Sequence, residues 1–159
     1  MRVTWGLVLL VACGGDDGGA GTDAAANLTA HQFCVQETNR YRAINSKPAL
    51  TESMQLETYA DTGAMVDFNS GPHSHFMTTQ GGGISFAENE CPKWDLQAQG
   101  RGDMTMLVAA CIAAFYSEGP GTDYSMHGHY INMMGNYGSL GCGIFQSGST
   151  VTIVQDYGR

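Results

Sequence analysis

The sequence predicts one α+β domain in which three helices precede a C-terminal antiparallel hairpin, and three observations lead to this class. The chain has 159 residues, of which 43% are hydrophobic, enough for the core of a single domain of ordinary size. Apolar residues recur at helical spacing in three segments before Gly119. Two segments with alternating apolar residues then close the chain. Helices followed by a hairpin favour an α+β sandwich with a small antiparallel sheet.

The first two helices are predicted from caps and from apolar spacing. The first is expected to begin after the capping-box pair Thr29 and Gln32 and to end before Pro48. Its apolar face comprises Phe33, Cys34, Tyr41 and Ile44. The second is expected over Ser53–Phe68, with a stripe of partly small residues: Leu56, Tyr59, Ala60, Gly63 and Asp67.

The third helix has the clearest periodicity, and short strands complete the domain. Asp103 is its expected N-cap, and the helix is expected to end at Gly119-Pro120-Gly121. The apolar residues follow the pattern of a core-facing helix: Met104, Leu107, Val108, Cys111, Ile112 and Phe115. The expected strands are Ile84–Glu88 and a hairpin of Gly138–Phe145 and Val151–Tyr157, with Gln146–Ser149 as its turn.

The charge of the chain excludes one class of partner. Seven Lys and Arg stand against fifteen Asp and Glu, a formal net charge of −8. Binding to nucleic acid phosphates requires clustered cations that displace counterions. We therefore expect no nucleic acid partner.

The beginning of the chain has the features of an export signal. Arg2 is followed by an apolar run about as long as the core of a signal peptide. The run ends in Leu10-Val11-Ala12-Cys13, which resembles the lipobox of bacterial lipoproteins. Residues 1–12 are thus predicted to be a lipoprotein signal peptide, and Cys13 the lipidated residue that anchors the protein to a membrane. An ordinary secretory signal with a chance cysteine is the alternative.

The residues after Cys13 predict a tether and a location. Residues 14–27 contain no aromatic and no large aliphatic side chain, so residues 13–27 are expected to be flexible and the folded domain to span 28–159. Gly14 follows Cys13, and the first acidic residue comes only at Asp16, which resembles an outer-membrane sorting signal. The expected location is the bacterial cell envelope, with the outer membrane or cell surface favoured, or else secretion.

The other four cysteines are predicted to form two disulfides. They are Cys34, Cys91, Cys111 and Cys142. An even number in an exported domain implies disulfides, and four cysteines allow three pairings, among which the sequence does not choose. A zinc site with four cysteine ligands is disfavoured because no C-x-x-C pair occurs.

Histidines and isolated glutamates are the candidate functional residues. Two H-x-H tripeptides occur, His73-Ser74-His75 and His127-Gly128-His129. On an extended segment both side chains of such a pair point the same way and could bind one ion, although chance clustering in polar loops is a comparable explanation. Glu88 ends an apolar segment, and Glu118 follows the third predicted helix.

Common hydrolase signatures are absent from the sequence. Neither a G-x-S-x-G elbow nor an H-E-x-x-H helix occurs. The spacing of Ser74 or Ser125 from histidine gives no specific support for a catalytic triad.

Seven short motifs, taken in order, resemble those of the CAP superfamily (cysteine-rich secretory proteins, antigen 5 and pathogenesis-related protein 1), also called the SCP domain. They are Asn39-Arg40-Tyr41-Arg42 for H-N-x-x-R with Thr38 in place of His, the helix Leu50–Ala60, Pro72-His73-Ser74-His75-Phe76, Ala87-Glu88-Asn89 for G-E-N, Phe115-Tyr116-Ser117-Glu118 for W-Y-x-E, Gly128-His129-Tyr130, and Gly141-Cys142-Gly143. Together they span about Leu28 to Tyr157.

The resemblance implies a fold and a site. The fold is a three-layer α-β-α sandwich with a small antiparallel sheet, built around a large central cleft. In several members two His and two Glu in that cleft bind a divalent cation. The corresponding residues are His73 (or His75), Glu88, Glu118 and His129, and imidazole with carboxylate indicates Zn²⁺.

The resulting functional expectation is an envelope-anchored CAP-domain lipoprotein that binds a small lipid or a protein ligand in its cleft. The first alternative is a metal-dependent protease or esterase in which Glu88 and Glu118 carry the catalysis. The second is a metal-independent adhesin or toxin-like protein. A binding module without catalysis is the favoured interpretation.

Overall fold

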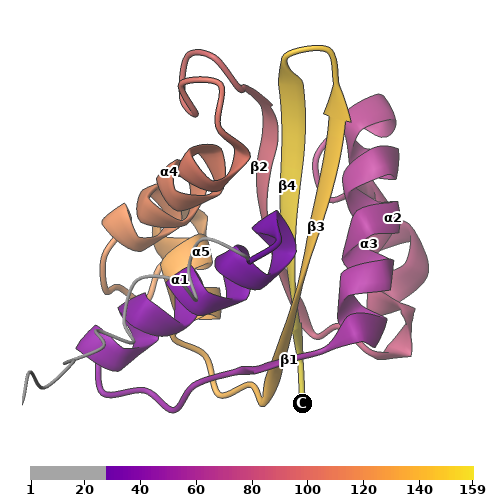
Figure 1. Cartoon of the computed structure of the whole chain (residues 1–159). Coiled ribbons are helices and arrows are strands. Elements are labelled where there is room, and N and C mark those ends of the chain that lie inside the picture. The colour runs from indigo at the N-terminus through magenta and orange to yellow at the C-terminus, as the bar shows by residue number, and fades with distance from the viewer. Residues whose placement is uncertain (1–27) are drawn as a thin grey trace, which may run out of the picture.

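The computed structural model describes residues 28–159 and forms a three-layer α-β-α sandwich. The predicted signal peptide (1–12), Cys13 and the tether lie outside the described residues. The elements are α1 Ala30–Ile44, β1 Thr51–Glu52, α2 Met54–Ser70, α3 Ser74–Thr79, the 3-10 helix η2 Gln80–Gly83, β2 Ala87–Asp95, α4 Met104–Ser117, α5 Tyr124–Met133, β3 Ser139–Ser147 and β4 Thr150–Gly158. Helices α1, α4 and α5 cover one face of the sheet, and α2 and α3 cover the other (Figure 1). The predicted fold class is confirmed.

The sheet is mixed, with strand order β1-β3-β4-β2. Strand β4 pairs antiparallel with β3, as the predicted hairpin requires, and antiparallel with β2 on its other side, whereas the short β1 runs parallel to β3. The hairpin turn is tighter than expected, because Ser147 and Thr150 are paired and only two residues connect the strands. Gly148 takes φ 63 at the first of these positions, as type II′ hairpin turns require.

Strand β4 is buried on both of its faces. Val151, Ile153 and Tyr157 belong to the larger core, which the sheet forms with α1 and α4. Val154 points the other way and packs against Ala60 and Ala64 of α2. Burial on both faces explains why this strand is apolar at successive positions, as central strands of layered folds are.

Caps and periodicity set the helices as predicted. Thr29 and Gln32 form a complete capping box at the start of α1, and Asp103 caps α4 by accepting from the backbone N–H of Met106. Helix α4 buries five of the six residues in the predicted apolar pattern: Leu107, Val108, Cys111, Ile112 and Phe115. The prediction that Ile44 belongs to the apolar face of this helix is wrong, because Ile44 is the last residue of α1 and is 61% exposed.

Near the end of α1 the buried side chain is that of Arg42, not that of Ile44. Arg42 connects α1 to the end of α5. Its Nη1 donates to the carbonyls of Met133 (2.6 Å) and Gly135 (3.1 Å), and its Nε donates to that of Pro48 (2.9 Å). Asn39 exchanges two hydrogen bonds with the backbone of Leu50. The residues resembling H-N-x-x-R therefore hold loops in place and lie away from the candidate site.

Glycines allow α2 to approach β3 closely. A Cβ atom on Gly141 would lie 2.2 Å from the backbone N of Glu57, and one on Gly143 would lie 2.0 Å from the carbonyl C of Ala60. No side chain fits at either position. The Gly-Cys-Gly segment thus sets the distance between the sheet and the α2 layer.

Two disulfides connect the layers on the α1 and α4 side, as the cysteine count predicts. Cys34 of α1 bonds to Cys142 of β3, and Cys91 of β2 bonds to Cys111 of α4. All four cysteines are buried. None of the helices within residues 28–159 has the length and apolar character needed to cross a membrane.

The connecting segments differ from the prediction. The strand expected at Ile84–Glu88 begins at Ala87 and extends to Asp95, because Gln80–Gly83 forms a 3-10 turn before it. Helices α3 and α5 were not predicted. Helix α5 contains His127-Gly128-His129, and α3 begins within His73-Ser74-His75, so neither tripeptide is an extended segment.

Candidate functional site

A cleft of about 540 Å³ opens where the two helical layers meet beside β2. Strand β2 is at one end of the sheet order, so its outer edge faces α3 from one layer and α5 from the other. The cleft is lined by His73, Phe76, Met77, Phe86, Ala87, Glu88, Glu118, Tyr124, Ser125, Gly128, His129, Asn132 and Tyr137. The two layers thus contribute opposite walls.

The first wall is built on His73, the residue that precedes α3. Its backbone is left-handed, with φ 61 and ψ 8, which is unusual for a residue other than glycine. Glu88 Oε1 lies 2.8 Å from the ring Nδ1, and the backbone N–H donates to Glu90 Oε2 at 2.8 Å. Glu88 and Glu90 are two residues apart on β2 and so share one face of the strand. Both carboxylates thus hold His73 in this conformation.

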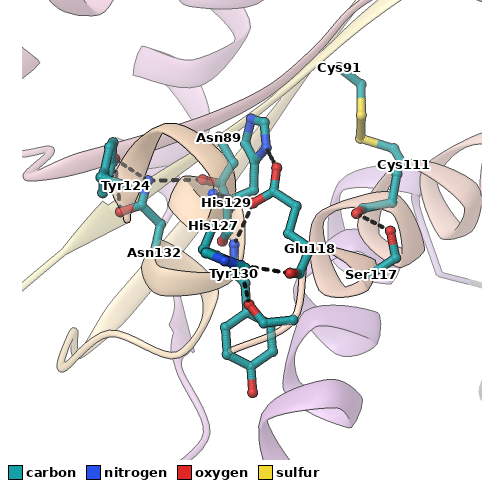
Figure 2. A network of polar contacts seen from close by, with 12 residues as sticks. Asn89, Cys91, Cys111, Ser117, Glu118, Tyr124, His127, His129, Tyr130 and Asn132 are labelled. Atoms are coloured by element: carbon teal, nitrogen blue, oxygen red, sulfur yellow. Dashed lines mark hydrogen bonds and ion pairs between the residues drawn. A yellow bond between two sulfur atoms is a disulfide. The ribbon is translucent and has the colours of Figure 1, made fainter. Parts of the chain in front are cut away.

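The second wall pairs Glu118, at the end of α4, with His129 of α5. Glu118 Oε1 bonds to His129 Nδ1, while Oε2 accepts from the backbone N–H groups of His129 (2.9 Å) and Tyr130 (3.3 Å). The His129 ring also stacks on Phe115, with 4.6 Å between centroids. Figure 2 shows Glu118 hydrogen-bonded to the ring of His129 and to the backbone N–H of Tyr130. Each wall therefore carries one His–Glu pair.

A polar network connects the two walls. The side-chain amide of Asn89 donates to the carbonyl of His129 at 3.1 Å. That of Asn132 donates to the carbonyl of Glu88 (3.1 Å), to Asn89 Oδ1 (2.9 Å) and to the Tyr124 hydroxyl (2.8 Å). Asn132 bridges Asn89 and Tyr124 in Figure 2. The network joins β2 to α5 and fixes the spacing of the walls.

The other histidine of each pair lies elsewhere. His75 does not line the cleft: its ring packs on Tyr59, with 4.6 Å between centroids. His127 directs its Nδ1 to the carbonyls of Glu118 (2.7 Å) and Gly119 (3.0 Å). The prediction that both side chains of each tripeptide point the same way is wrong. His127-Gly128-His129 lies within α5, where residues two apart point to different sides, and His73-Ser74-His75 runs from a left-handed residue into the first turn of α3.

Burial changes the protonation of the acids on this face of the sheet. Desolvation raises the pKa of Glu88, opposed by its bond to His73, and raises that of Glu90 to about 7. The hydrogen bond that the His73 ring donates to Glu88 raises the pKa of His73. Among residues 28–159 no lysine or arginine forms an ion pair with either glutamate. The first wall is therefore a buried, acid-rich site.

The grouping of possible metal ligands differs from the predicted tetrad. Three residues, His73, Glu88 and Glu90, each offer one possible ligand atom, and these three atoms lie within 4.8 Å of one another. In the described part of the chain no group of three at this spacing takes residues from both walls. Glu90 is not among the site residues predicted from the sequence. Its position two residues after Glu88 on a strand was the signal that could have identified it.

Comparison with known proteins identifies the family. A family model for CAP, the cysteine-rich secretory protein family, matches residues 35–157, most of the chain. The chain belongs to the CAP family. Both His–Glu pairs of the cleft lie within the matched region. No curated protein matches the sequence. Two buried disulfides and membership in a family of secretory proteins fit an extracytoplasmic location for this CAP domain.

Proposed function

We propose that this CAP protein is an envelope-anchored binding module whose cleft holds a small ligand with an apolar part, such as a lipid, together with a divalent cation. The observation that carries the proposal is one cleft with a His–Glu pair on each wall and an apolar rim. Met77, Phe86 and Tyr124 line it and are 73%, 47% and 59% exposed. Exposed apolar side chains gathered around polar groups are typical of ligand sites.

The donor set fits a divalent cation. Glu88 has a buried Oε2 with no hydrogen-bond partner, and imidazole and carboxylate groups are ligands that Zn²⁺ accepts. His73, Glu88, Glu118 and His129 line the cleft and are available to hold the ion. A bound Zn²⁺ would supply positive charge to attract an anionic or carbonyl group of the ligand.

Calorimetric titration of the purified protein with Zn²⁺ tests the cation. We expect saturable binding that is lost in a Glu88→Ala, His129→Ala double variant, which removes one residue from each wall. His31→Ala is the matched control, because His31, Glu57 and Asp61 form a separate group of possible ligands outside the cleft. Equal affinity in the double variant and the wild type would refute a cation in the cleft.

Anchoring through Cys13 is the second part of the proposal. It is supported by the lipobox-like Leu10-Val11-Ala12-Cys13 and by the glycine-rich segment that follows it. In a bacterial host we expect the wild type in the membrane fraction and Cys13→Ser in the soluble fraction. Mass spectrometry should find an acylated N-terminal peptide beginning at Cys13. An unmodified Cys13 in the wild type would show that the anchor is wrong.

A metal-dependent hydrolase is the second candidate, favoured by the position of Glu118. This carboxylate faces the cleft from the wall opposite His73 and Glu88, and its side chain is 24% exposed. Such a group could accept a proton from water. Ester or peptide turnover that disappears with both chelator and Glu118→Gln would support catalysis. A protein loaded with Zn²⁺ that is inactive on a broad substrate panel would exclude it.

A further inference from the structure

A group of possible metal ligands lies outside the cleft, on the β3 side of the sheet. His31, Glu57 and Asp61 each offer one possible ligand atom, and these three atoms lie within 4.8 Å of one another. The cleft is lined by other residues. His31 belongs to α1, whereas Glu57 and Asp61 belong to α2. The group therefore joins the two helix layers that cover opposite faces of the sheet (Figure 1).

Two hydrogen bonds hold Asp61 at the edge of the sheet. Strand β1 pairs with β3 at Ser139 and Leu140, near the start of β3. Further along β3, the backbone N–H of Ile144 donates to Asp61 Oδ1 at 3.0 Å. The ring Nε2 of His31 lies 2.9 Å from the same oxygen. These contacts bring Asp61 and His31 together beside β3 before any ion binds.

The charges around this group favour a cation. Glu57 and Asp61 are four residues apart on α2, so their side chains are neighbours on the helix surface and their negative charges repel. Burial raises the pKa of Glu57, and the charge of His31 opposes this effect. The charges of Asp61 and Glu52 raise the same pKa further. Across residues 28–159, the ion pairs of these acids comprise only that of Asp61 with His31. A cation bound between the two carboxylates would replace repulsion by attraction.

The donor set and the exposure of the group suit a divalent transition metal. Imidazole and carboxylate are ligands of Zn²⁺, which can keep water in a fourth position beside three protein ligands. Two ligand atoms of tetrahedral Zn²⁺ lie roughly 3.4 Å apart, given metal–ligand distances of about 2.1 Å. Small side-chain rotations bring the three atoms to this spacing. The side chains of His31 and Asp61 are 26% and 45% exposed, so an ion can reach them from solvent. Because water competes for such exposed groups, we expect weaker binding than in the cleft.

We propose that His31, Glu57 and Asp61 form a second divalent-cation site, which binds Zn²⁺ and links α1 to α2 around the edge of β3. The role of this ion is structural. An ion that binds the folded protein and not the unfolded chain stabilises the fold by mass action. The inference is independent of the proposed function, because the site shares no residue with the cleft.

Calorimetric titration of the full chain carrying Glu88→Ala and His129→Ala tests this site without the cleft. At Zn²⁺ concentrations above those that fill the cleft of the wild type, we expect one ion to bind and the melting temperature to rise. Asp61→Asn keeps an acceptor for the Ile144 N–H but removes the charge. It should weaken this binding by about tenfold or more, since even supporting residues of a metal site contribute that much. Glu52→Gln is the matched control: it removes a nearby charge outside the group and should change the affinity less than about threefold.

The number of bound ions and the Ile144 amide locate the site. Native mass spectrometry in excess Zn²⁺ should find one ion fewer on His31→Ala than on the wild type. The NMR signal of the Ile144 N–H should shift when this ion binds, because the group donates to Asp61. Unfolding curves in chelator establish that each variant folds.

The outcomes separate this inference from the proposed function. Failure of Zn²⁺ to bind the Glu88→Ala, His129→Ala variant would overturn the inference alone, as would equal losses of affinity in Asp61→Asn and Glu52→Gln. The proposed function depends instead on whether the tighter binding of the wild type disappears in that double variant.

Discussion

Among single residues, Asp156 shows how burial alters protonation in this protein. It lies opposite Glu88 in the β2–β4 ladder and is fully buried. Ser85 Oγ donates to its Oδ1 at 2.5 Å, and its Oδ2 has no partner. Burial, followed by the charge of Glu88, raises the pKa of Asp156 to about 8. The group is thus neutral in the folded protein at pH values where it is ionised in the unfolded chain.

The stability of the protein should therefore decrease as the pH rises. A folded pKa near 8 against an ordinary value of 3.8 means that the folded state binds more protons, so the free energy of unfolding falls between these values. Asp67 of α2, Glu88 of β2 and His73 before α3 also act on Asp156.

We expect Asp156→Asn to reduce this pH dependence, because asparagine has no proton to release. Urea unfolding in chelator at pH 5 and pH 8 measures how steeply the free energy of unfolding changes with pH. Glu52→Gln, at an exposed position, is the control. An unchanged slope in Asp156→Asn would show that this residue ionises alike in both states.

The site residues were predictable to the extent that they belong to short motifs. His73, Glu88, Glu118 and His129 were named from such motifs, and the structure brings them into one cleft. Glu90 has no motif of its own. Its role depends on α3 placing the backbone of His73 above β2, a tertiary contact that the sequence does not display.

At the scale of elements, the contact between α2 and β3 depends on the absence of side chains. Gly141 and Gly143 lie against the backbone of α2, where a Cβ atom would meet backbone atoms at 2.2 and 2.0 Å. Backbone cannot be displaced as a flexible side chain can. The helix layer must therefore shift if either glycine is replaced.

We expect Gly143→Ala to lower the free energy of unfolding by about 1–3 kcal/mol, the usual cost of overpacking. Gly138→Ala is a matched control in the same region of the chain, because its Cβ would make ordinary contact at 3.5 Å. Thermal and urea unfolding of both variants measure the difference. Equal stability would mean that α2 adjusts to the methyl group without cost.

Helices differ in how well the sequence reveals them. Helix α4 was predicted closely because its buried residues follow the helical period and Asp103 caps it. Helix α5 was not predicted, because it is short, contains Gly128, and buries only Asn132 and Met133. Packing between α4 and β2 stabilises α5, and single-sequence periodicity carries no such information.

At the scale of the whole molecule, the two disulfides close loops of very different length. Cys34–Cys142 joins residues 108 apart, whereas Cys91–Cys111 joins residues 20 apart. In the chain-entropy model a loop of about 100 residues contributes about 4.7 kcal/mol and one of about 15 residues about 3 kcal/mol. The longer loop should therefore contribute more to stability.

We expect the Cys34→Ala, Cys142→Ala variant to lose about 1–2 kcal/mol more stability than the Cys91→Ala, Cys111→Ala variant. All four side chains are buried, so the cavities created are similar. Urea unfolding of both double variants tests the order. A greater loss in the second variant would show that native packing outweighs loop closure.

The layered architecture could be predicted from the order of elements, whereas the disulfide pairing could not. Cysteine spacing allows three pairings, and the choice depends on α1 packing against β3 and on α4 bringing Cys111 to Cys91 of β2. The parallel β1 was also missed, because two residues carry too little periodicity to show a strand.

The Cys34–Cys142 bond has a further consequence for a protein exposed to proteases. A single cut at any peptide bond between these two residues leaves both fragments in one covalent molecule. That interval contains both walls of the cleft, from His73 to His129. A nicked molecule can thus keep its cleft assembled, and it would separate into two bands on a gel only after reduction.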